Sequence, residues 1–213
     1  MTTLATPHLL SVSDLHKSYF GIPVLKDVGF TLRPGEAVAI VGPNGSGKTT
    51  LLKCVAGTED IDEGTIELDG KPLRESDPAV RAAMACLLDD VDYFPDLSVV
   101  EHLRLYAWAH GGADPEDTVD SMLAEVEITG AADQLPATLS SGQRHRLGLA
   151  SCLVRPRRLL VLDEPEQRLD SGGRAWLASR LNAEKAAGVG VVFASHDQEL
   201  IDATADRTIE VGA

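Results

Sequence analysis

Long apolar runs and closely spaced cysteines are both absent from this chain of 213 residues. Because a membrane-spanning helix needs about 20 consecutive apolar residues, we expect no such helix. The N-terminal MTTLATPHLLSVSD lacks a basic start and a long apolar stretch, so we expect no secretory signal and a cytosolic protein. Its three cysteines, Cys54, Cys86 and Cys152, never form a C-x-x-C pair. We expect reduced thiols that fill apolar space rather than metal ligands.

Positive charge is scarce. The chain has 19 Lys and Arg residues against 33 Asp and Glu residues, which gives a formal net charge of −14. Because a nucleic acid is held mainly by cations against its phosphates, we expect no nucleic acid as the main partner. The same charge disfavours direct docking on anionic lipid.

Alternating strand and helix patterns predict one α/β domain spanning residues 1–213. AVAIV, LLVLD and VGVVFAS are continuous apolar runs, as expected for parallel strands buried on both faces. LLSVSDLHKSYF and VLKDVGFTL alternate apolar and polar residues, and Asp69-Gly70 predicts a tight turn between short strands. We therefore expect a mostly parallel core sheet, an antiparallel β portion at about 9–35 and 60–75, and an inserted helical subdomain at about 90–140.

The stretch GPNGSGKT after AVAIV is the strongest local motif. It fits the pattern G-x-x-x-x-G-K-[ST] between an expected strand and an expected helix. Glycines let successive N–H groups turn inward, and the helix N-terminus adds its own unpaired N–H groups. An ordinary Gly-rich turn is the structural alternative. Phosphate binding is favoured, although the motif alone does not separate a kinase from a GTPase or a motor.

A second motif lies in LSSGQRHRLGLASCLVRP, where Ser140 or Ser141 can cap a helix that Pro156 ends. By itself this is an amphipathic helix of a common kind. Twenty residues after Gln143, however, the strand LLVLDEP ends in Asp163 and Glu164. Carboxylates at a strand end often only cap the next turn, but downstream of a phosphate loop they suggest a magnesium ligand and a second acid.

The ordered set GPNGSGKT, LSSGQ, LLVLDEP and SHD resembles the ATP-binding subunit of ABC (ATP-binding cassette) transporters over essentially the whole chain. The resemblance implies a P-loop NTPase fold, ATP and Mg²⁺ as cofactors, and ATP hydrolysis that powers transport. It also implies a second ABC ATPase subunit, identical or different, paired head-to-tail, and integral membrane subunits at the inner face of the cell membrane. SVVEHLRLYAWAHGG further resembles the helical insert of ABC-2-type exporters.

The resemblance also implies residue roles. Glu164 would polarise the attacking water, His196 would contact the γ-phosphate, and Lys48 would reach the β- and γ-phosphates. An aromatic ring would stack on adenine, with Phe20 as the substitute for Tyr19. The implied nucleotide contacts are Tyr19, Gly42, Pro43, Asn44, Gly45, Ser46, Gly47, Lys48, Thr49, Thr50, Ser140, Ser141, Gly142 and Gln143. The implied metal-site residues are Thr49, Asp163 and Asp89.

Two departures from the family pattern concern coupling rather than nucleotide chemistry. Asp89 stands where the family usually has glutamine, and Gln167-Arg168 replaces Ser-Gly/Ala; Ser141 in place of the commoner glycine is a minor change. Two other functions stay open. One is a non-transport member of the superfamily, which the absence of coiled coils, zinc modules and a second cassette disfavours. The other is a regulatory module that holds ATP without useful turnover. The transported substrate, the direction of transport and the membrane partner are not encoded in these motifs.

Overall fold

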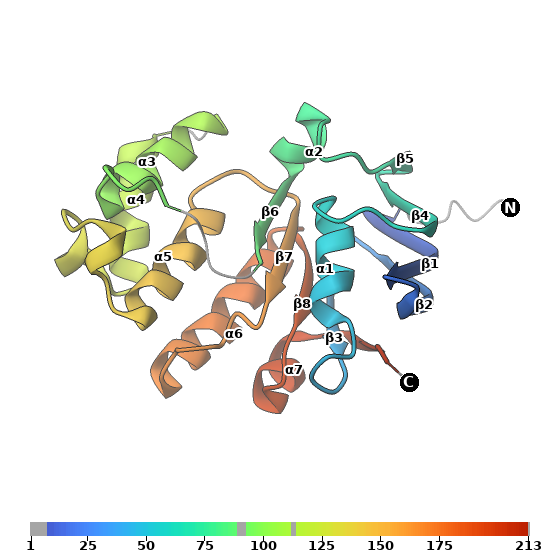
Figure 1. Ribbon diagram of the computed structural model, residues 1–213. Helices are drawn as coiled ribbons and strands as arrows, with labels where there is room; N and C mark the ends of the chain where they lie inside the picture. Colours follow the sequence, from blue (N-terminus) through green and yellow to red (C-terminus); the bar gives the residue numbers. More distant parts are fainter. Residues whose placement is uncertain (1–7, 89–92, 112–113, 213) are drawn as a thin grey trace, which may run out of the picture.

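Two sheets form the frame of the molecule (Figure 1). The structure is a computed structural model that describes residues 8–88, 93–111 and 114–212. The antiparallel sheet has the order β2-β1-β4-β5 and the parallel sheet the order β6-β7-β8-β3-β9, which confirms the predicted fold class. The strands are β1 (Leu10–Tyr19), β2 (Ile22–Leu32), β3 (Ala37–Val41), β4 (Glu63–Leu68), β5 (Lys71–Pro72), β6 (Met84–Leu87), β7 (Leu159–Asp163), β8 (Gly190–Ala194) and β9 (Arg207–Glu210).

The parallel sheet is buried on both faces because its central strands carry apolar side chains on both faces. In β3, Ala37 and Ala39 pack into one core cluster, whereas Val38 and Ile40 pack into the other. The same alternation holds in β7 and β8. Each strand thus supplies two cores, since successive side chains of a strand point to opposite faces. The central strands are thereby held rigidly where they end at the site.

Helices cover both faces of the parallel sheet. Helix α1 packs on the face shared with the antiparallel sheet, and α5 and α6 belong to the other core. In Figure 1 α3, α4 and α5 lie at the opposite end of the molecule from β1 and β2. The helices are α1 (Lys48–Ala56), α2 (Pro78–Ala83), α3 (Val99–Ala109), α4 (Pro115–Glu125), α5 (Ser141–Leu153), α6 (Ser171–Ala186) and α7 (Gln198–Thr204), with 3₁₀ turns η1 (Thr129–Ala131) and η2 (Pro136–Thr138).

The predicted tight turn between short strands is present at Asp69-Gly70. Both residues have positive φ, 53° and 72°, and Leu68 pairs with Lys71 across the two-residue turn. Positive φ at both central positions is the geometry that matches the twist of an antiparallel pair. None of the helices within the described residues combines the length and apolarity that crossing a membrane requires.

The three thiols are free; Cys54 and Cys152 are buried and Cys86 is partly buried. Burial raises the pKa of Cys54 to about 11 and the pKa values of Cys86 and Cys152 to about 12. Since only the thiolate is nucleophilic, we expect Ellman's reagent at pH 8 to modify the native thiols far more slowly than those of the urea-unfolded chain. Fast modification of all three native thiols would contradict their burial.

Candidate functional site

The phosphate loop (42–49) follows β3 and leads directly into α1. Two of its glycines are required by close approach. A Cβ on Gly42 would lie 2.4 Å from the carbonyl oxygen of Val211, and a Cβ on Gly47 would lie 2.9 Å from the side chains of Val24 and Leu25. Both glycines have positive φ, 153° and 103°. The loop is thus held between β2 and the C-terminal segment in a shape that other residues would disrupt.

Several polar groups of the loop are left to a ligand. The residue before α1 is Gly47, which has no side chain to cap the helix. The first N–H groups of α1 are therefore not bonded to a capping side chain. The hydroxyl of Ser46 is buried and makes no hydrogen bond within the described residues. The Lys48 ammonium is buried and donates to the carbonyl oxygens of Gly42 and Pro43 at 3.0 and 3.1 Å. Uncapped N–H groups, a spare hydroxyl and a cation fit a polyphosphate.

A cavity of about 310 Å³ lies at the ends of the parallel strands. Three of the predicted residues, Thr49, Asp163 and Glu164, line it together. No group of three or more His, Cys or carboxylate side chains suited to a metal occurs among the described residues. Mg²⁺ does not require one, because it is usually held by one or two protein oxygens, waters and substrate phosphates. The oxygens of Thr49 and Asp163 fit that donor set.

Glu164 occupies a constrained position between two strands. Its φ of 45° is unusual for a residue with a side chain, and its N–H donates to the carbonyl oxygen of Ala194 at 2.9 Å. Its Oε1 lies 3.5 Å from Nε2 of His196. Strained backbone at a polar cavity is typical of functional sites. The structure therefore brings the predicted acid and the predicted histidine side by side.

The signature segment (139–143) does not line that cavity within the described residues. Ser140 caps α5: its hydroxyl accepts from the N–H of Gln143 at 3.2 Å, and its own N–H donates to Oε1 of Gln143 at 2.9 Å. The side chains of Ser140 and Ser141 are exposed. Four of the residues expected to contact the nucleotide, Ser140, Ser141, Gly142 and Gln143, thus lie outside the cavity that the phosphate loop shares with Asp163 and Glu164. A ligand in that loop would leave them unused unless a second chain presented them.

The helix that follows the signature segment is fixed to the loop after Glu164. His145 donates from Nε2 to the carbonyl oxygen of Pro165 at 2.7 Å, and Arg146 reaches Asp170 at 3.4 Å. The sequence interpretation did not single out His145, although it lines the cavity together with Gln167 and Arg168. Its position two residues after the LSSGQ motif is the one signal for it in the sequence.

The aromatic residues expected at adenine lie where β1 turns into β2: Tyr19 ends β1 and Phe20 follows it in the turn. Tyr19 is about one-third exposed, and the Lys17 ammonium stands 5.1 Å from its ring centroid. The same ammonium is held by Glu59 at 2.7 Å and by the carbonyl oxygen of Asp60 at 2.6 Å. Phe20 is fully exposed. The Lys17 ammonium thus orients the ring of Tyr19, whereas the side chain of Phe20 lies in solvent.

Asp89, the third residue predicted at the metal, lies outside the described residues. Its proposed role therefore stays a prediction.

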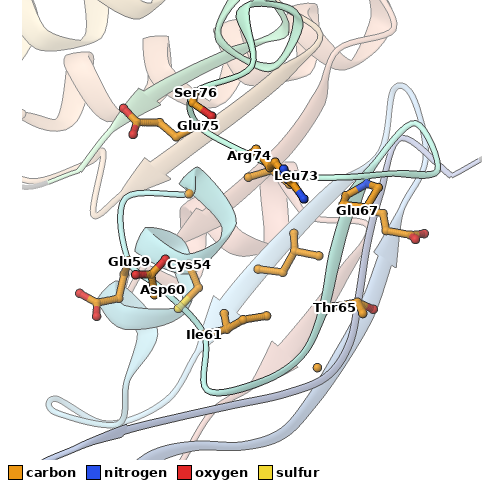
Figure 2. Close-up of a pocket in the computed structure, with 14 residues that line it drawn as sticks. Cys54, Glu59, Asp60, Ile61, Thr65, Glu67, Leu73, Arg74, Glu75 and Ser76 are labelled. Carbon is orange, nitrogen blue, oxygen red and sulfur yellow. The ribbon is translucent and has the colours of Figure 1, made fainter.

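A larger cavity, about 490 Å³, lies between the C-terminal end of α1 and β4 (Figure 2). It contains none of the predicted site residues. In Figure 2 the carboxylates of Glu59 and Glu67 point outward on opposite sides, while Ile61 points into the space. Nothing in this lining resembles a phosphate or metal site, so we place the functional site at the phosphate loop.

Comparison with protein families and with solved structures identifies the family of this chain. Residues 25–167, about two thirds of the chain, match the family described as ABC transporter. A solved chain titled as the ATP binding subunit of an ABC transporter superposes with a TM-score of 0.88 at 29% identity, covering 95% of this chain and 85% of its own. The dimeric post-hydrolysis cassette MJ0796, bound to ADP and Pi, superposes with a TM-score of 0.85 at 23% identity, covering 95% and 94%, and shows the shared fold.

Named relatives serve transport in both directions. SkfE of Bacillus subtilis, the SkfA peptide export ATP-binding protein, is 34% identical over 94% of this chain and 84% of its own. EcsA of the same organism, an ABC-type transporter ATP-binding protein, is 33% identical over 93% and 80%. FbpC of Pseudomonas fluorescens, an Fe(3+) ions import ATP-binding protein, is 37% identical over 89%, but the match spans only 54% of that longer chain.

Proposed function

Because this chain belongs to the ABC transporter family and is one of its ATP-binding, ATP-hydrolysing subunits, we propose that two such subunits pair head-to-tail around ATP. The observation that carries this proposal is the separation within one chain. Thr49, Asp163 and Glu164 share one cavity, whereas the exposed Ser140 and Ser141 stand outside it. A partner's signature segment, presented at a helix N-terminus, would cover the phosphates from the other side.

The phosphate loop binds the nucleotide and orients it. Lys48 exchanges its two loop carbonyls for the β- and γ-phosphates, and the Ser46 hydroxyl gains the partner that it lacks in the loop. Thr49 and Asp163 would hold Mg²⁺, which would supply positive charge against the phosphates. Tyr19, oriented by Lys17, offers a ring face to adenine.

Glu164 and His196 act on the attacking water. The Glu164 carboxylate accepts a hydrogen bond from the water and polarises it toward the γ-phosphate. His196, 3.5 Å from that carboxylate, donates to the γ-phosphate and fixes the water between them. Positioning and electrostatic stabilisation supply most of the catalysis in phosphoryl transfer. The rate should therefore depend on the relative placement of these two side chains.

Membrane subunits on other chains complete the transporter, as is general for this family. We place the subunit on the cytoplasmic side of the membrane, bound through those subunits. Export is the direction favoured by the 98–112 resemblance and by SkfE, whose name records peptide export. Co-purification from the native cell would test this: an integral membrane protein supports it, whereas retention of the chain by a soluble assembly would oppose it. Phosphate release by the purified chain would exclude a regulatory module without turnover.

The dimer itself is testable with a variant that binds ATP without hydrolysing it. In Glu164→Gln, ATP should convert monomer to dimer, because a ligand that binds the closed dimer more tightly than the monomer stabilises the dimer. Multi-angle light scattering reads the mass directly. An unchanged mass with ATP would count against the sandwich, and mixing with a second, different cassette would reveal a heterodimer.

A second substitution identifies the surface that closes the dimer. Ser141→Glu, added to Glu164→Gln, places a carboxylate where the γ-phosphate should dock. A carboxylate at the N-terminus of α5 is compatible with the helix dipole, so the helix itself should remain stable. We expect the dimer to be lost and ATP binding by the monomer to persist. Ser121→Glu, the same change on an exposed residue of α4, is the matched control.

A further inference from the structure

Glu166 is a buried carboxylate that the proposed mechanism does not use. Its side chain is 9% exposed, two residues after Glu164. Its Oε1 accepts from the hydroxyl of Ser195 at 2.5 Å and from the N–H of His196 at 3.3 Å. Its Oε2 is buried without a hydrogen-bond partner within the described residues. Burying a carboxylate is costly unless it is well bonded, so a half-satisfied one at an active site calls for an explanation.

The contacts of Glu166 fix the switch segment (195–197), which carries His196 between β8 and α7. Ser195 has only one orientation open to it, since its hydroxyl donates to Glu166 and accepts from the N–H of Asp197 at 2.9 Å. Asp197 in turn caps α7 through the N–H groups of Glu199 and Leu200. A single carboxylate oxygen thus holds the N–H of His196 directly and the N–H of Asp197 through the Ser195 hydroxyl.

The same stretch of chain also carries the catalytic acid. Glu164 is attached to the end of β8, directly before the switch segment, because its N–H donates to the carbonyl oxygen of Ala194 at 2.9 Å. Glu164 and Glu166 therefore bracket the backbone of His196 from one short loop, and the 3.5 Å separation of the Glu164 and His196 side chains depends on both attachments.

We propose that Glu166 is a positioning residue that sets the imidazole of His196 against Glu164 and the γ-phosphate. It touches no reacting atom and acts only through the switch segment. The inference rests on the role proposed for His196. Without the carboxylate, Ser195 and the His196 N–H lose their shared acceptor, and the ring samples positions that do not fix the water. A misplacement of about 1 Å can cost roughly 10²-fold in rate.

The test is a double-mutant cycle between Glu166 and His196, with steady-state ATPase kinetics as the readout. Glu166→Ala should lower kcat roughly tenfold and change the KM for ATP by less than about twofold, because the phosphate loop is untouched. In a His196→Ala background the same change should alter kcat by less than about twofold, since nothing remains to be positioned. Glu166→Gln keeps one acceptor oxygen and should recover most of kcat.

A milder variant guards against misfolding. Ser195→Ala removes one of the two donors and should lower kcat with the same dependence on His196. Its matched control is Ser151→Ala, which deletes another buried hydroxyl, bonded to the carbonyl oxygen of Leu147 at 2.8 Å, away from the site. This control should leave kcat unchanged.

The outcomes distinguish failure of the positioning role of Glu166 from failure of the role proposed for His196. If Glu166→Ala and Ser195→Ala each lowered kcat by the same factor with His196 present and in the His196→Ala background, the positioning role would be overturned. The two residues would then have only a structural role. Full activity of Glu166→Ala, with His196→Ala impaired, would also overturn it. Full activity of His196→Ala would instead refute the proposed role of the histidine.

Discussion

Glu164→Gln is expected to bind ATP and to turn it over roughly 10²-fold or more slowly than the unaltered subunit, within the range of a general-base contribution. The amide keeps the shape of the side chain and removes its charge. Glu164 lines the cavity with Thr49 and Asp163 and lies 3.5 Å from His196. It is the acid immediately after the proposed metal ligand, so the water loses its polarising carboxylate.

Phosphate release and nucleotide binding should be measured on the same preparation. We expect ATP affinity to be retained, because Lys48 and the uncapped start of α1 are unchanged. Glu210→Gln, the same change at an exposed position of β9, is the matched control and should leave turnover unaffected. Near-normal hydrolysis by Glu164→Gln would remove this residue from the mechanism, whatever the state of the dimer.

Local sequence patterns were sufficient for the phosphate loop and the buried strands. The runs AVAIV and LLVLD form β3 and β7, and VGVVFAS contains β8, because a continuous apolar run of that length is stable chiefly between two layers. The edge strands β6 and β9 were not specifically predicted. Each has four residues, and β9 carries exposed charges, so neither shows a periodicity that distinguishes it from a loop.

The contacts that organise the site were not predictable in the same way. The bond between Glu166 and Ser195 spans 29 residues of sequence, and only the pairing of β7 with β8 brings the two together. The capping of α5 by Ser140 was local and was anticipated as a cap, whereas the tie of His145 to Pro165 was not. Motifs identify which residues carry the chemistry; the tertiary fold decides what positions them.

Arg157 and Arg158 are adjacent in sequence, but the first forms a buried ion pair and the second an exposed one. Replacing each therefore compares the contributions of a buried and an exposed ion pair to stability. Arg157 binds both carboxylate oxygens of Glu184, the Nε contact being 2.9 Å, and the two side chains are 8% and 6% exposed. It also donates to the carbonyl oxygens of Leu153 and Arg155 at 2.9 and 2.7 Å, at the end of α5. Arg158 forms two 2.6 Å contacts with Asp69, but those side chains are 55% and 41% exposed.

Arg157→Met is expected to lower the free energy of unfolding by about 3–5 kcal/mol, because it leaves Glu184 and the end of α5 buried with fewer partners. Arg180, 2.8 Å from Glu184, still offsets part of the charge of that carboxylate, so we expect the loss of unfolding free energy to lie near the lower end of this range. Arg158→Met should cost less than about 1 kcal/mol, since water and salt screen an exposed pair. Urea unfolding of both variants at low and high salt measures the difference. Equal losses would show that burial does not set the strength of these two ion pairs.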